Sequence, residues 1–495
     1  MPTTLRRPIR AIILSGAASL ALAACTTVPG AGVPAGSPIT QQEAAQGAQY
    51  HQQFVAEFGG AETGPQAQYV EQVGKNIAVQ SGLANAQSAF TVTLLNSSVD
   101  NAFAVPGGYV YITRQLVDLM NNEAELAGVM GHEVGHVAAR HSARREAQAQ
   151  QNAILGVLGQ VLAGAVLGDS ALGQLGQKIA GTAPQLATLS YSRNQELQAD
   201  QLGVTYLKRA GYDPRAMASV LQSLAAQNSL DAQLMGRDST IPEWASTHPD
   251  PAGRVQNALQ LADTAGVGGV TNRDTFLTRI DGLTYGDDPK QGMIEGRTFT
   301  HPEYRLTFSV PQGYYMINGT RAVSIGGQTG QAQFSSGLFN GNLDTYVASV
   351  FKAIGGDQST LAPQSIQKTT INGIPAAVGQ ARVSNGSQNV DVVVYAYQFS
   401  NTQAFHFAAI APAGQAGVFN PMFQSLRRIS ATEASAIVPR KIQVVTAGSN
   451  DSVGTLARRM AFSDAQEQRF RILNGLFGSA QVVPGQKYKI VVRAR

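Results

Sequence analysis

Hydrophobic positions recur at helical spacing near the start of the chain. Residues 41–58 and 65–80 place apolar or aromatic side chains three or four positions apart, which predicts two amphipathic helices. A β-branched run at 90–95 predicts a strand. Short apolar segments at 102–105 and 109–113, separated by a Pro-Gly-Gly turn, predict two more strands. The pattern therefore predicts a small mixed sheet among helices.

A strongly apolar run at 126–130 leads into a predicted helix that continues to about Arg145. Asn121 or Asn122 can cap its first turn, where acidic side chains also suit the helix dipole. Another apolar run, at 153–168, is short for a transmembrane helix, which needs about 20 residues. We therefore expect a buried helix or a lid there, with a membrane-touching hairpin as the alternative.

The periodicity changes from helical to alternating after residue 300. Before that point, apolar spacing predicts helices at 192–210, 214–228 and 251–262. After it, short alternating segments interspersed with helical ones predict a separate α+β domain. The expected strands are 304–310, 331–339, 376–383, 390–399 and 405–410, and the expected helices are 343–354 and 416–429.

The last segment of the chain has its own strand–helix–helix–strand pattern. A strand at 442–445 precedes a helix that starts near Asp451, and a second helix ends at 471–476. A turn at 483–486 then leads into a strand at 488–492. The pieces Asp-Ser-Val, Leu-Asn-Gly-Leu and Pro-Gly-Gln in this order resemble a LysM domain, and that resemblance implies a possible glycan ligand.

These patterns predict an α+β protein with a mainly helical first domain that contains a small sheet. The expected divisions are a signal peptide at 1–24, a tether at 25–38, the helical domain at 39–265, a linker at 266–300, an α+β domain at 301–432 and a LysM-like module at 440–495.

Composition narrows the function classes. The chain has 495 residues and a formal net charge of +4, with no Lys/Arg-rich run, so we expect no nucleic-acid partner. Cys25 is the single cysteine, which excludes an intramolecular disulfide and a cysteine-based zinc site.

The position of Cys25 indicates membrane attachment. A basic segment with Arg6, Arg7 and Arg10 precedes the apolar stretch 11–21, and small residues lead up to Cys25. This arrangement resembles a bacterial lipoprotein signal, which implies cleavage before Cys25 and lipidation of its thiol. An ordinary signal peptide or a short membrane anchor is the alternative.

The residues after Cys25 indicate where such a lipoprotein would lie. They form a Gly/Pro/Ala-rich tether that ends at Pro38 and has no core-forming pattern. Thr26 is not the Asp that retains enterobacterial lipoproteins at the inner membrane. We therefore expect an outer-membrane anchor that faces the periplasm.

The predicted helix at 126–145 carries the chemistry. His132 and His136 are four residues apart, so on a helix they lie about 40° apart and both imidazoles can reach one Zn²⁺. Glu133 lies beside them, where it can take a proton from a metal-bound water. Gly135 costs helix stability, which suggests close backbone packing or access at that position.

A catalytic zinc site needs a third protein ligand. His141 follows His136 by five residues and would point about 140° away on a continuing helix, so it is a poor ligand. Glu196 and Asp200 are four residues apart and face one way on the predicted helix 192–210. Spacing alone does not select Glu196 from the other acidic residues nearby.

Five motifs occur in a fixed order over about residues 40–262. Together they resemble the gluzincin metallopeptidases of the CAAX prenyl protease type, in their soluble periplasmic bacterial branch. The motifs are Asn101-Ala-Phe-Ala-Val-Pro-Gly-Gly108, Asn122-Glu-Ala-Glu-Leu-Ala127, His132-Glu-Val-Gly-His136 with Arg140-His141, Ser192-Arg193 with Glu196 and Ala199-Asp200, and Ser246-Thr-His-Pro249 with Arg254.

The resemblance implies one Zn²⁺ per chain, held by His132, His136 and Glu196. It also implies that Glu133 is the general base and acid of peptide hydrolysis. We expect His248 near the metal, where it either stabilises the tetrahedral intermediate or blocks the open coordination position.

Further residues receive supporting roles from the resemblance. Asp200 is expected to hold the free N–H of a ligand histidine, and Arg193 and Arg254 are expected to pair with site carboxylates or substrate. The strand Asn101-Ala102-Phe103 is expected to offer its edge to an extended substrate backbone.

The expected function is that of a zinc endopeptidase in cell-envelope protein quality control, with misfolded or unassembled envelope proteins as substrates. A non-proteolytic assembly factor on a peptidase scaffold is one alternative. A second is a peptidoglycan-associated binding protein that acts through residues 440–495. The sequence shows no 34-residue helical repeat, so the substrate cannot be carried over from the resemblance. It also shows no spanning helices of the kind that intramembrane relatives have, which argues against a CAAX substrate.

Overall fold

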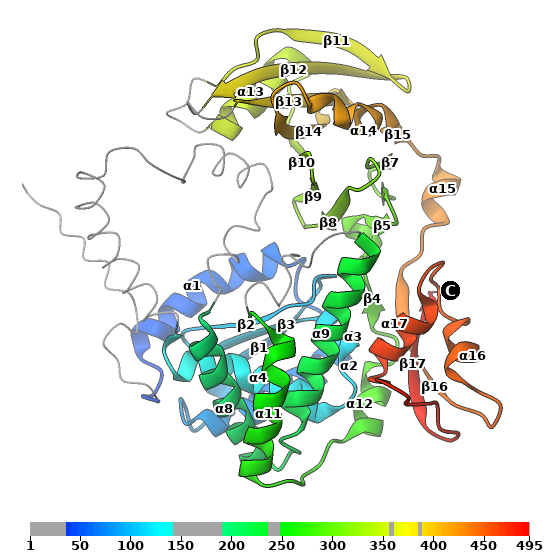
Figure 1. Ribbon diagram of the computed structural model, residues 1–495. Coiled ribbons are helices and arrows are strands. Elements are labelled where there is room, and N and C mark those ends of the chain that lie inside the picture. Colours follow the sequence, from blue (N-terminus) through cyan, green and yellow to red (C-terminus); the bar gives the residue numbers. More distant parts are fainter. Residues whose placement is uncertain (1–35, 142–190, 236–247, 356–360, 385–388, 495) are drawn as a thin grey trace, which may run out of the picture.

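The computed structural model describes residues 36–141, 191–235, 248–355, 361–384 and 389–494. Cys25, the signal segment and the helix predicted at 153–168 lie outside these ranges. Figure 1 shows a helical body in blue to green, an α+β domain above it in light green to orange, and a terminal module in orange to red beside the body. Within the described residues, no helix has the length and apolar character needed to cross a membrane. The predicted α+β class is confirmed.

The small sheet of the helical body has three strands in the order β1-β3-β2. β1 (Thr91–Leu95) pairs in parallel with β3 (Tyr109–Thr113), and β2 (Ala102–Val105) pairs antiparallel to β3. This is the mixed sheet that the alternating segments predict, and β2 is its edge strand.

Helices surround α4 (Glu123–Ala138), in which every side chain is buried. A helix that is buried on all sides belongs in the middle of a domain, so α4 is the centre of this body. The other helices are α1 (Gln41–Glu57), α2 (Pro65–Ala78), α3 (Arg114–Leu119), α8 (Arg193–Arg209), α9 (Ala216–Met235), α11 (Pro251–Ala265) and α12 (Arg273–Ile280).

The two ends of α4 differ in how well the sequence predicts them. Asn122 caps the first turn, because its side chain accepts a hydrogen bond from the backbone N–H of Glu125. The predicted extension to Arg145 is wrong, since α4 ends at Ala138 and Arg140 has a φ of 56°. A left-handed residue stops an α-helix, and helical spacing of side chains does not reveal it.

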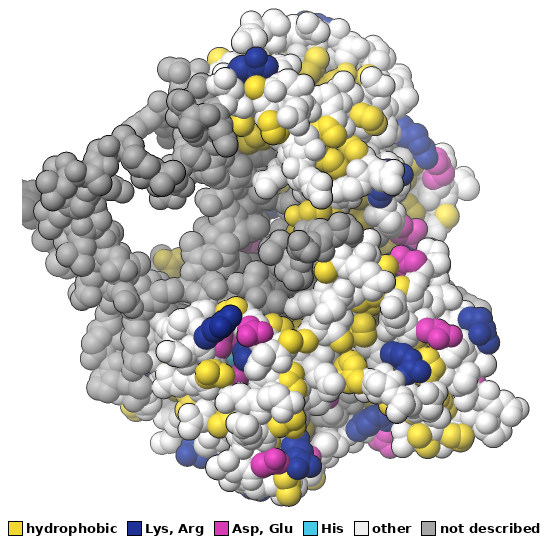
Figure 2. Space-filling model, in the orientation of Figure 1, with side chains coloured by type: hydrophobic (Ala, Val, Ile, Leu, Met, Phe, Trp, Pro, Cys, Tyr) yellow, Lys and Arg dark blue, Asp and Glu magenta, His cyan; other side chains and the backbone are white. Residues whose placement is uncertain are grey.

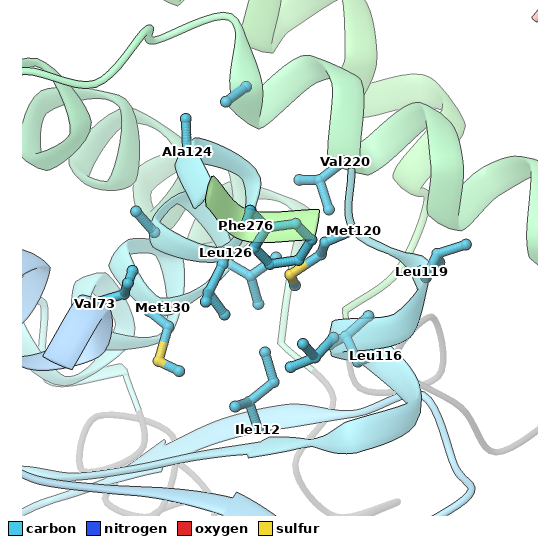
Figure 3. Packing of buried hydrophobic residues seen from close by; sticks show 14 of the residues in the cluster. Val73, Ile112, Leu116, Leu119, Met120, Ala124, Leu126, Met130, Val220 and Phe276 are labelled. Atoms are coloured by element: carbon cyan, nitrogen blue, oxygen red, sulfur yellow. The ribbon is translucent and has the colours of Figure 1, made fainter. Parts of the chain in front are cut away.

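The first half of α4 is held by apolar packing. Figure 3 shows Leu126 and Met130 among Val73 of α2, Ile112 of β3 and Phe276 of α12. These side chains come from segments far apart in the sequence and form one continuous cluster, so α4 is fixed from several directions at once.

The segment 266–300 is not a simple linker, contrary to the sequence prediction. It contains α12, whose Phe276, Leu277 and Ile280 are fully or almost fully buried in the core of the helical body. Three apolar residues in a short polar helix are too few for the sequence to predict a buried helix. The structure shows that they pack into the core of the helical body. The segment also contains β4 (Thr284–Tyr285), a 3₁₀ turn at Pro289–Gln291, β5 (Met293–Glu295) and β6 (Thr298–His301).

The α+β domain is built on a seven-stranded antiparallel sheet in the order β11-β12-β13-β14-β10-β9-β8. α13 (Leu343–Gly355) packs on β12 and β13 through one apolar cluster, and the opposite face has a second cluster. The strands of this sheet are β8 (Tyr315–Asn318), β9 (Ala322–Gly327), β10 (Gly330–Leu338), β11 (Ile366–Ile371), β12 (Ile374–Ser384), β13 (Asn389–Gln398) and β14 (Gln403–Pro412).

The helix predicted at 416–429 is only partly present. A 3₁₀ turn at Ala416–Phe419 is followed by the short α14 (Asn420–Ser425). The chain then becomes extended, because β15 (Arg427–Arg428) pairs with β7 (Leu306–Ser309). Pairing with a strand more than a hundred residues away overrides the local helical pattern. β15, β7, β6 and β5 form a second, four-stranded sheet.

The terminal module has the predicted strand–helix–helix–strand order. β16 (Arg440–Thr446) and β17 (Lys487–Arg493) pair antiparallel, and between them lie α16 (Val453–Ala457) and α17 (Gln466–Leu473). β4 from the segment before the α+β domain adds a third strand beside β16. A short helix, α15 (Ala431–Ser435), precedes the module.

The terminal module shares its core with the helical body. Its Phe470, Tyr488 and Ile490 belong to the same apolar cluster as α4. Lys489 is fully buried, and its Nζ donates hydrogen bonds to the carbonyl oxygens of Asp118, at 2.7 Å, and Met120. Burial lowers the pKa of Lys489 to about 7. The module is thus packed into the body at the turn that precedes α4.

Candidate metal centre

Two glycines allow α4 and α8 to cross closely at the second half of α4. A Cβ at Gly135 would lie 3.2 Å from the carbonyl oxygen of Ala199, and one at Gly203 would lie 3.1 Å from the backbone N of His132. The backbones of the two helices are therefore nearly in contact. The close packing that the sequence suggested at Gly135 is confirmed, and it brings the side chains of α8 to those of α4.

Four buried side chains meet at this crossing. They are His132 and His136 of α4, Glu196 of α8 and His248, which precedes α11, and their ligand atoms all lie within 4.8 Å of one another. The Nε2 atoms of His132 and His136 are 3.0 Å apart, and Glu196 Oε1 is 3.3 Å from His136 Nε2. Glu196 Oε2 is 3.5 Å from His132 Nε2.

These separations fit a tetrahedral zinc ion. With zinc-to-ligand bonds of about 2.0–2.1 Å, two ligand atoms of a tetrahedron are about 3.3 Å apart. Two of the separations, 3.0 Å between the imidazoles and 3.3 Å between His136 and Glu196 Oε1, lie close to that value, and the third, 3.5 Å, runs from His132 to the other carboxylate oxygen of Glu196. Two imidazoles and one carboxylate are also a ligand set that catalytic zinc sites use.

His248 occupies the fourth corner of this arrangement. Its Nδ1 lies 3.3 Å from His132 Nε2 and 3.1 Å from Glu196 Oε1. A catalytic zinc site keeps this corner for water or substrate. The Nε2 of His248 is 3.4 Å from Oε1 of Glu133, so the same ring also contacts the carboxylate beside the ligand atoms.

Asp200 and Arg254 contact the cluster on the side of His132 that faces away from the other ligand atoms. Asp200 Oδ1 lies 3.0 Å from Nδ1 of His132, the ring nitrogen that faces away from the other ligand atoms. The guanidinium of Arg254 donates to both carboxylate oxygens of Asp200, at 2.6 and 2.8 Å. Its Nη1 also lies 2.5 Å from Oε2 of Glu196. Arg254 thus joins two carboxylates on α8 to the first turns of α11.

The balance of charges at the centre favours binding of a cation. Burial alone would raise the pKa of both carboxyls, but the interaction with His248 and hydrogen bonds from His132 and His136 hold the pKa of Glu196 below its ordinary value, and hydrogen bonds from Arg254 and His132 do the same for Asp200. The guanidinium of Arg254 pairs with Glu196 and Asp200, and Glu133 lies 3.4 Å from His248. When the imidazoles are neutral, this leaves two negative charges, which a divalent ion would balance.

The two ligand histidines respond differently to burial. Burial lowers the pKa of His136 well below its ordinary value, which keeps its ring neutral as metal binding requires. Burial would also lower the pKa of His132, but its hydrogen bonds to Asp200 and Glu196 outweigh burial and raise it to about 9.

The helical body also has recognisable relatives. Residues 65–262 match the family model described as Peptidase family M48. This segment, called the M48 domain below, is therefore similar to Peptidase family M48. The match agrees with the metallopeptidase resemblance of the sequence motifs, and the matched segment contains the His/Glu cluster that could hold a metal ion.

The curated relatives of the M48 domain include envelope and mitochondrial proteases. The Beta-barrel assembly-enhancing protease of Yersinia pestis is 32% identical over 240 residues, which cover 48% of this chain and 47% of that protein. The protein of the same name in Escherichia coli K12 is 31% identical over 241 residues, with the same coverage. Mitochondrial metalloendopeptidase OMA1 of Arabidopsis thaliana is 32% identical over 162 residues, which cover 32% of this chain and 29% of that protein.

The similarity covers only part of each protein. This chain spans about half the length of the assembly-enhancing proteases that it matches. The α+β domain and the terminal module lie outside the M48 match, which ends at residue 262.

The M48 domain contains a contact that the sequence analysis missed. His141, which helical spacing placed far from His136, has its Nδ1 2.8 Å from the Nδ1 of His136. Its Nε2 lies 3.0 Å from Oε1 of Gln198 on α8. The sequence analysis missed this contact because it extended α4 past Ala138. The helix ends there, and the left-handed backbone of Arg140 turns the chain so that His141 lies beside His136.

Some of the other predicted site residues are buried and one is exposed. Asn101, Ala102 and Phe103 are buried where β2 begins, at the edge of the small sheet. Arg193 is exposed in the first turn of α8, unlike the buried Arg254. Tyr191, which the sequence analysis did not select, stacks on the ring of His136 with centroids 3.8 Å apart and forms a wall of the centre.

Proposed function

We propose that this chain is a zinc-dependent endopeptidase of the bacterial cell envelope, active in protein quality control. The observation that carries the proposal is the buried cluster of His132, His136, Glu196 and His248 beside Glu133. When bound there, zinc would polarise a peptide carbonyl and acidify a water molecule. His132, His136 and Glu196 would hold the ion, and Glu133 would do the proton transfer.

Glu133 is well placed for this role. It lies on α4 next to His132 and is almost fully buried, so its carboxylate works in a site that excludes bulk water. It would accept the proton of the attacking water and return it to the amine of the leaving peptide. Arg254 would keep Glu196 and Asp200 charged and in place during both transfers.

His248 would hold the site in a resting state. Its Nδ1 lies among the other ligand atoms, at the corner where water or substrate must enter. Of the two roles that the resemblance implied, the blocking role thus has direct geometric support. If the imidazole of His248 left this corner, its Nε2, which lies 3.4 Å from Oε1 of Glu133, could donate to a developing oxyanion instead.

The edge of β2 would bind the substrate backbone. β2 ends the three-stranded sheet within the described residues, and its Ala102 and Phe103 are buried against the body. An extended peptide can add to such an edge through backbone hydrogen bonds, and that mode accepts many sequences. It suits a protease whose substrates are unfolded or unassembled proteins.

The place of action rests on the N-terminal sequence and on the relatives. The segment that ends in Cys25 resembles a lipoprotein signal, so we propose a lipid anchor, an outer-membrane location and a domain that faces the periplasm. Two of the relatives are named beta-barrel assembly-enhancing proteases, which is consistent with the cell envelope. The terminal module, whose pattern resembles LysM, is a candidate contact for peptidoglycan.

Casein cleavage by the purified chain tests the proposal. The wild-type protein should cleave casein, lose activity with a chelator and regain it with zinc. Glu133→Gln should abolish cleavage while one zinc per chain stays bound, because the ligand set is intact. Full cleavage by Glu133→Gln would contradict the assigned mechanism, and no cleavage by zinc-loaded wild type would favour the assembly-factor alternative.

The binding alternative needs a separate assay. The wild-type chain and a chain that ends at residue 439 can be sedimented with purified peptidoglycan sacculi. Because the terminal module shares the core of the M48 domain, the shortened chain must first be shown to keep its thermal unfolding transition. Sedimentation of Glu133→Gln with sacculi at wild-type level would show binding that is independent of catalysis.

A further inference from the structure

The two ligand histidines of the proposed zinc site are supported by different groups. Each presents Nε2 to the other ligand atoms and Nδ1 to the protein behind it. The Nδ1 of His132 meets a carboxylate, Asp200. The Nδ1 of His136 meets the ring of His141 instead.

The protons in this second contact can be assigned from chemistry alone. If Nε2 of His136 binds a metal ion, its Nδ1 must carry the proton and donate it. The acceptor 2.8 Å away is Nδ1 of His141, so that nitrogen has no proton and the proton of the His141 ring is on Nε2. Nε2 then donates to the carbonyl oxygen of Gln198, 3.0 Å away. One consistent set of protons runs from His136 through His141 to α8.

The backbone is built to bring His141 to this position. On a continuing helix it would point about 140° away from His136. The chain instead turns at Arg140, whose φ of 56° is a left-handed conformation that is unfavourable for a residue with a side chain.

Buried contacts offset that cost. The Arg140 guanidinium lies 3.1 Å from Glu43, which is fully buried in α1, and donates to the carbonyl oxygen of Ser37 at 2.9 Å. The backbone N–H of Gly36 also donates to the carbonyl oxygen of Ala138, at the end of α4. Residues 36–43 therefore hold the turn that delivers His141.

We propose that His141 is a positioning residue that fixes the orientation and tautomer of His136 through a hydrogen-bond relay to Gln198. The inference rests on the proposed zinc site and deepens it. Such supports behind a ligand histidine typically affect metal affinity by about 10- to 100-fold. His141 thus does for His136 what Asp200 does for His132, but with a neutral ring in place of a carboxylate.

Zinc affinity of the full chain tests the proposal, with Zn²⁺ alone as the probe in competition with a colorimetric chelator. His141→Phe keeps a ring beside Tyr191 but removes the acceptor, so zinc affinity should fall about 10- to 100-fold. Thermal unfolding of the metal-free variant should stay close to wild type, because a purely structural loss would shift that transition instead. An unchanged zinc affinity would overturn the proposal.

Two further variants make the test specific. His301→Phe replaces another buried histidine, in β6 of the other domain, and should leave zinc affinity unchanged. Gln198→Ala removes the outer end of the relay from an exposed position, so it should fold normally and weaken zinc binding by a few-fold. Wild-type affinity in Gln198→Ala would contradict the relay.

A spectroscopic measurement on the wild-type protein tests the same assignment without any substitution. Nitrogen NMR of zinc-loaded wild type with labelled histidine should show the proton of His141 on Nε2 and the proton of His136 on Nδ1. A His141 ring with its proton on Nδ1 would overturn the assignment. Both readouts are independent of proteolysis, so an inactive protein that still binds zinc would refute the proposed function and leave this inference standing.

Discussion

The two halves of α4 lie in opposite environments. From Ala124 to Met130, apart from Glu125, the helix packs against apolar side chains of α2, β3 and α12 (Figure 3). From Gly131 to Ala138 it presents two imidazoles and a carboxylate to the polar groups of α8 and α11, while Val134, Val137 and Ala138 stay in the apolar core. Apolar burial is thus the main source of stability in the first half, whereas the metal-facing side of the second half buries charged groups that cost stability unless they are paired.

One rigid helix joins these two environments. Apolar packing fixes the first half, so the second half can hold its charged groups in the geometry that an ion needs. This difference predicts that substitutions in the first half of α4 change mainly stability, and that substitutions at the metal centre change mainly zinc affinity. On the face that Figure 2 shows, charged side chains are scattered among mostly uncharged ones.

Leu126→Ala should give the largest loss of stability. Leu126 is fully buried in the first half, and such a truncation removes about 2–5 kcal/mol from the free energy of unfolding. Below its lowered transition temperature the variant should still bind zinc with wild-type affinity. Chemical denaturation and a zinc titration check the two halves of this expectation, and a variant with weak zinc binding but normal stability would break the comparison.

Glu196→Ala should have its main effect on zinc binding. If one of four ligands carries about a quarter of the roughly 10–16 kcal/mol of a tightly held zinc, its loss weakens binding by roughly 100- to 1000-fold. The metal-free protein should also lose stability, because the buried guanidinium of Arg254 loses one of its carboxylate partners, so zinc affinity is the value that separates this variant from Leu126→Ala. Calorimetry without metal and chelator competition with metal give the two values. Retention of tight zinc binding would exclude Glu196 as a ligand.

Asp200→Asn should have a smaller effect on the same half. The amide keeps the shape of the side chain but loses the charge that faces Nδ1 of His132 and pairs with Arg254. We expect zinc affinity to fall about 10- to 100-fold. A comparison with His141→Phe then shows whether the carboxylate and the imidazole support their ligand histidines equally.

Asn122→Ala should have the smallest effect. The Asn122 side chain caps α4 through the backbone N–H of Glu125, at 2.9 Å, and its loss costs about 1 kcal/mol. In a domain of this size the transition temperature should fall by about 2–4 °C. Zinc affinity should not change, because the cap lies at the far end of the helix from the ligands; a marked loss would mean that fraying reaches the second half.

The sequence predicts the local structure around α4 well. The strands of the small sheet, the start of α4 and the shared face of His132 and His136 all follow from spacing within a few turns. Glu196 lies 60 residues beyond His136, so residue patterns alone could not choose it, and the family resemblance did. The geometry then places it at the centre.

Features that depend on distant contacts were missed. The buried α12, the end of α4 at Arg140, the contact of His141 with His136 and the core that the terminal module shares with the M48 domain all require segments that meet only in the folded chain. Pairing of β15 with β7 likewise replaced a predicted helix.

X-ray absorption at the zinc edge tests the central claim most directly, on the full chain loaded with one equivalent of zinc. We predict a shell of nitrogen and oxygen ligands at about 2.0–2.1 Å with the outer-shell signature of two or three imidazoles. That signature should be lost in a chain with both His132→Ala and His136→Ala. The same spectrum from that variant, or a zinc ion surrounded by water oxygens in the wild type, would contradict the account.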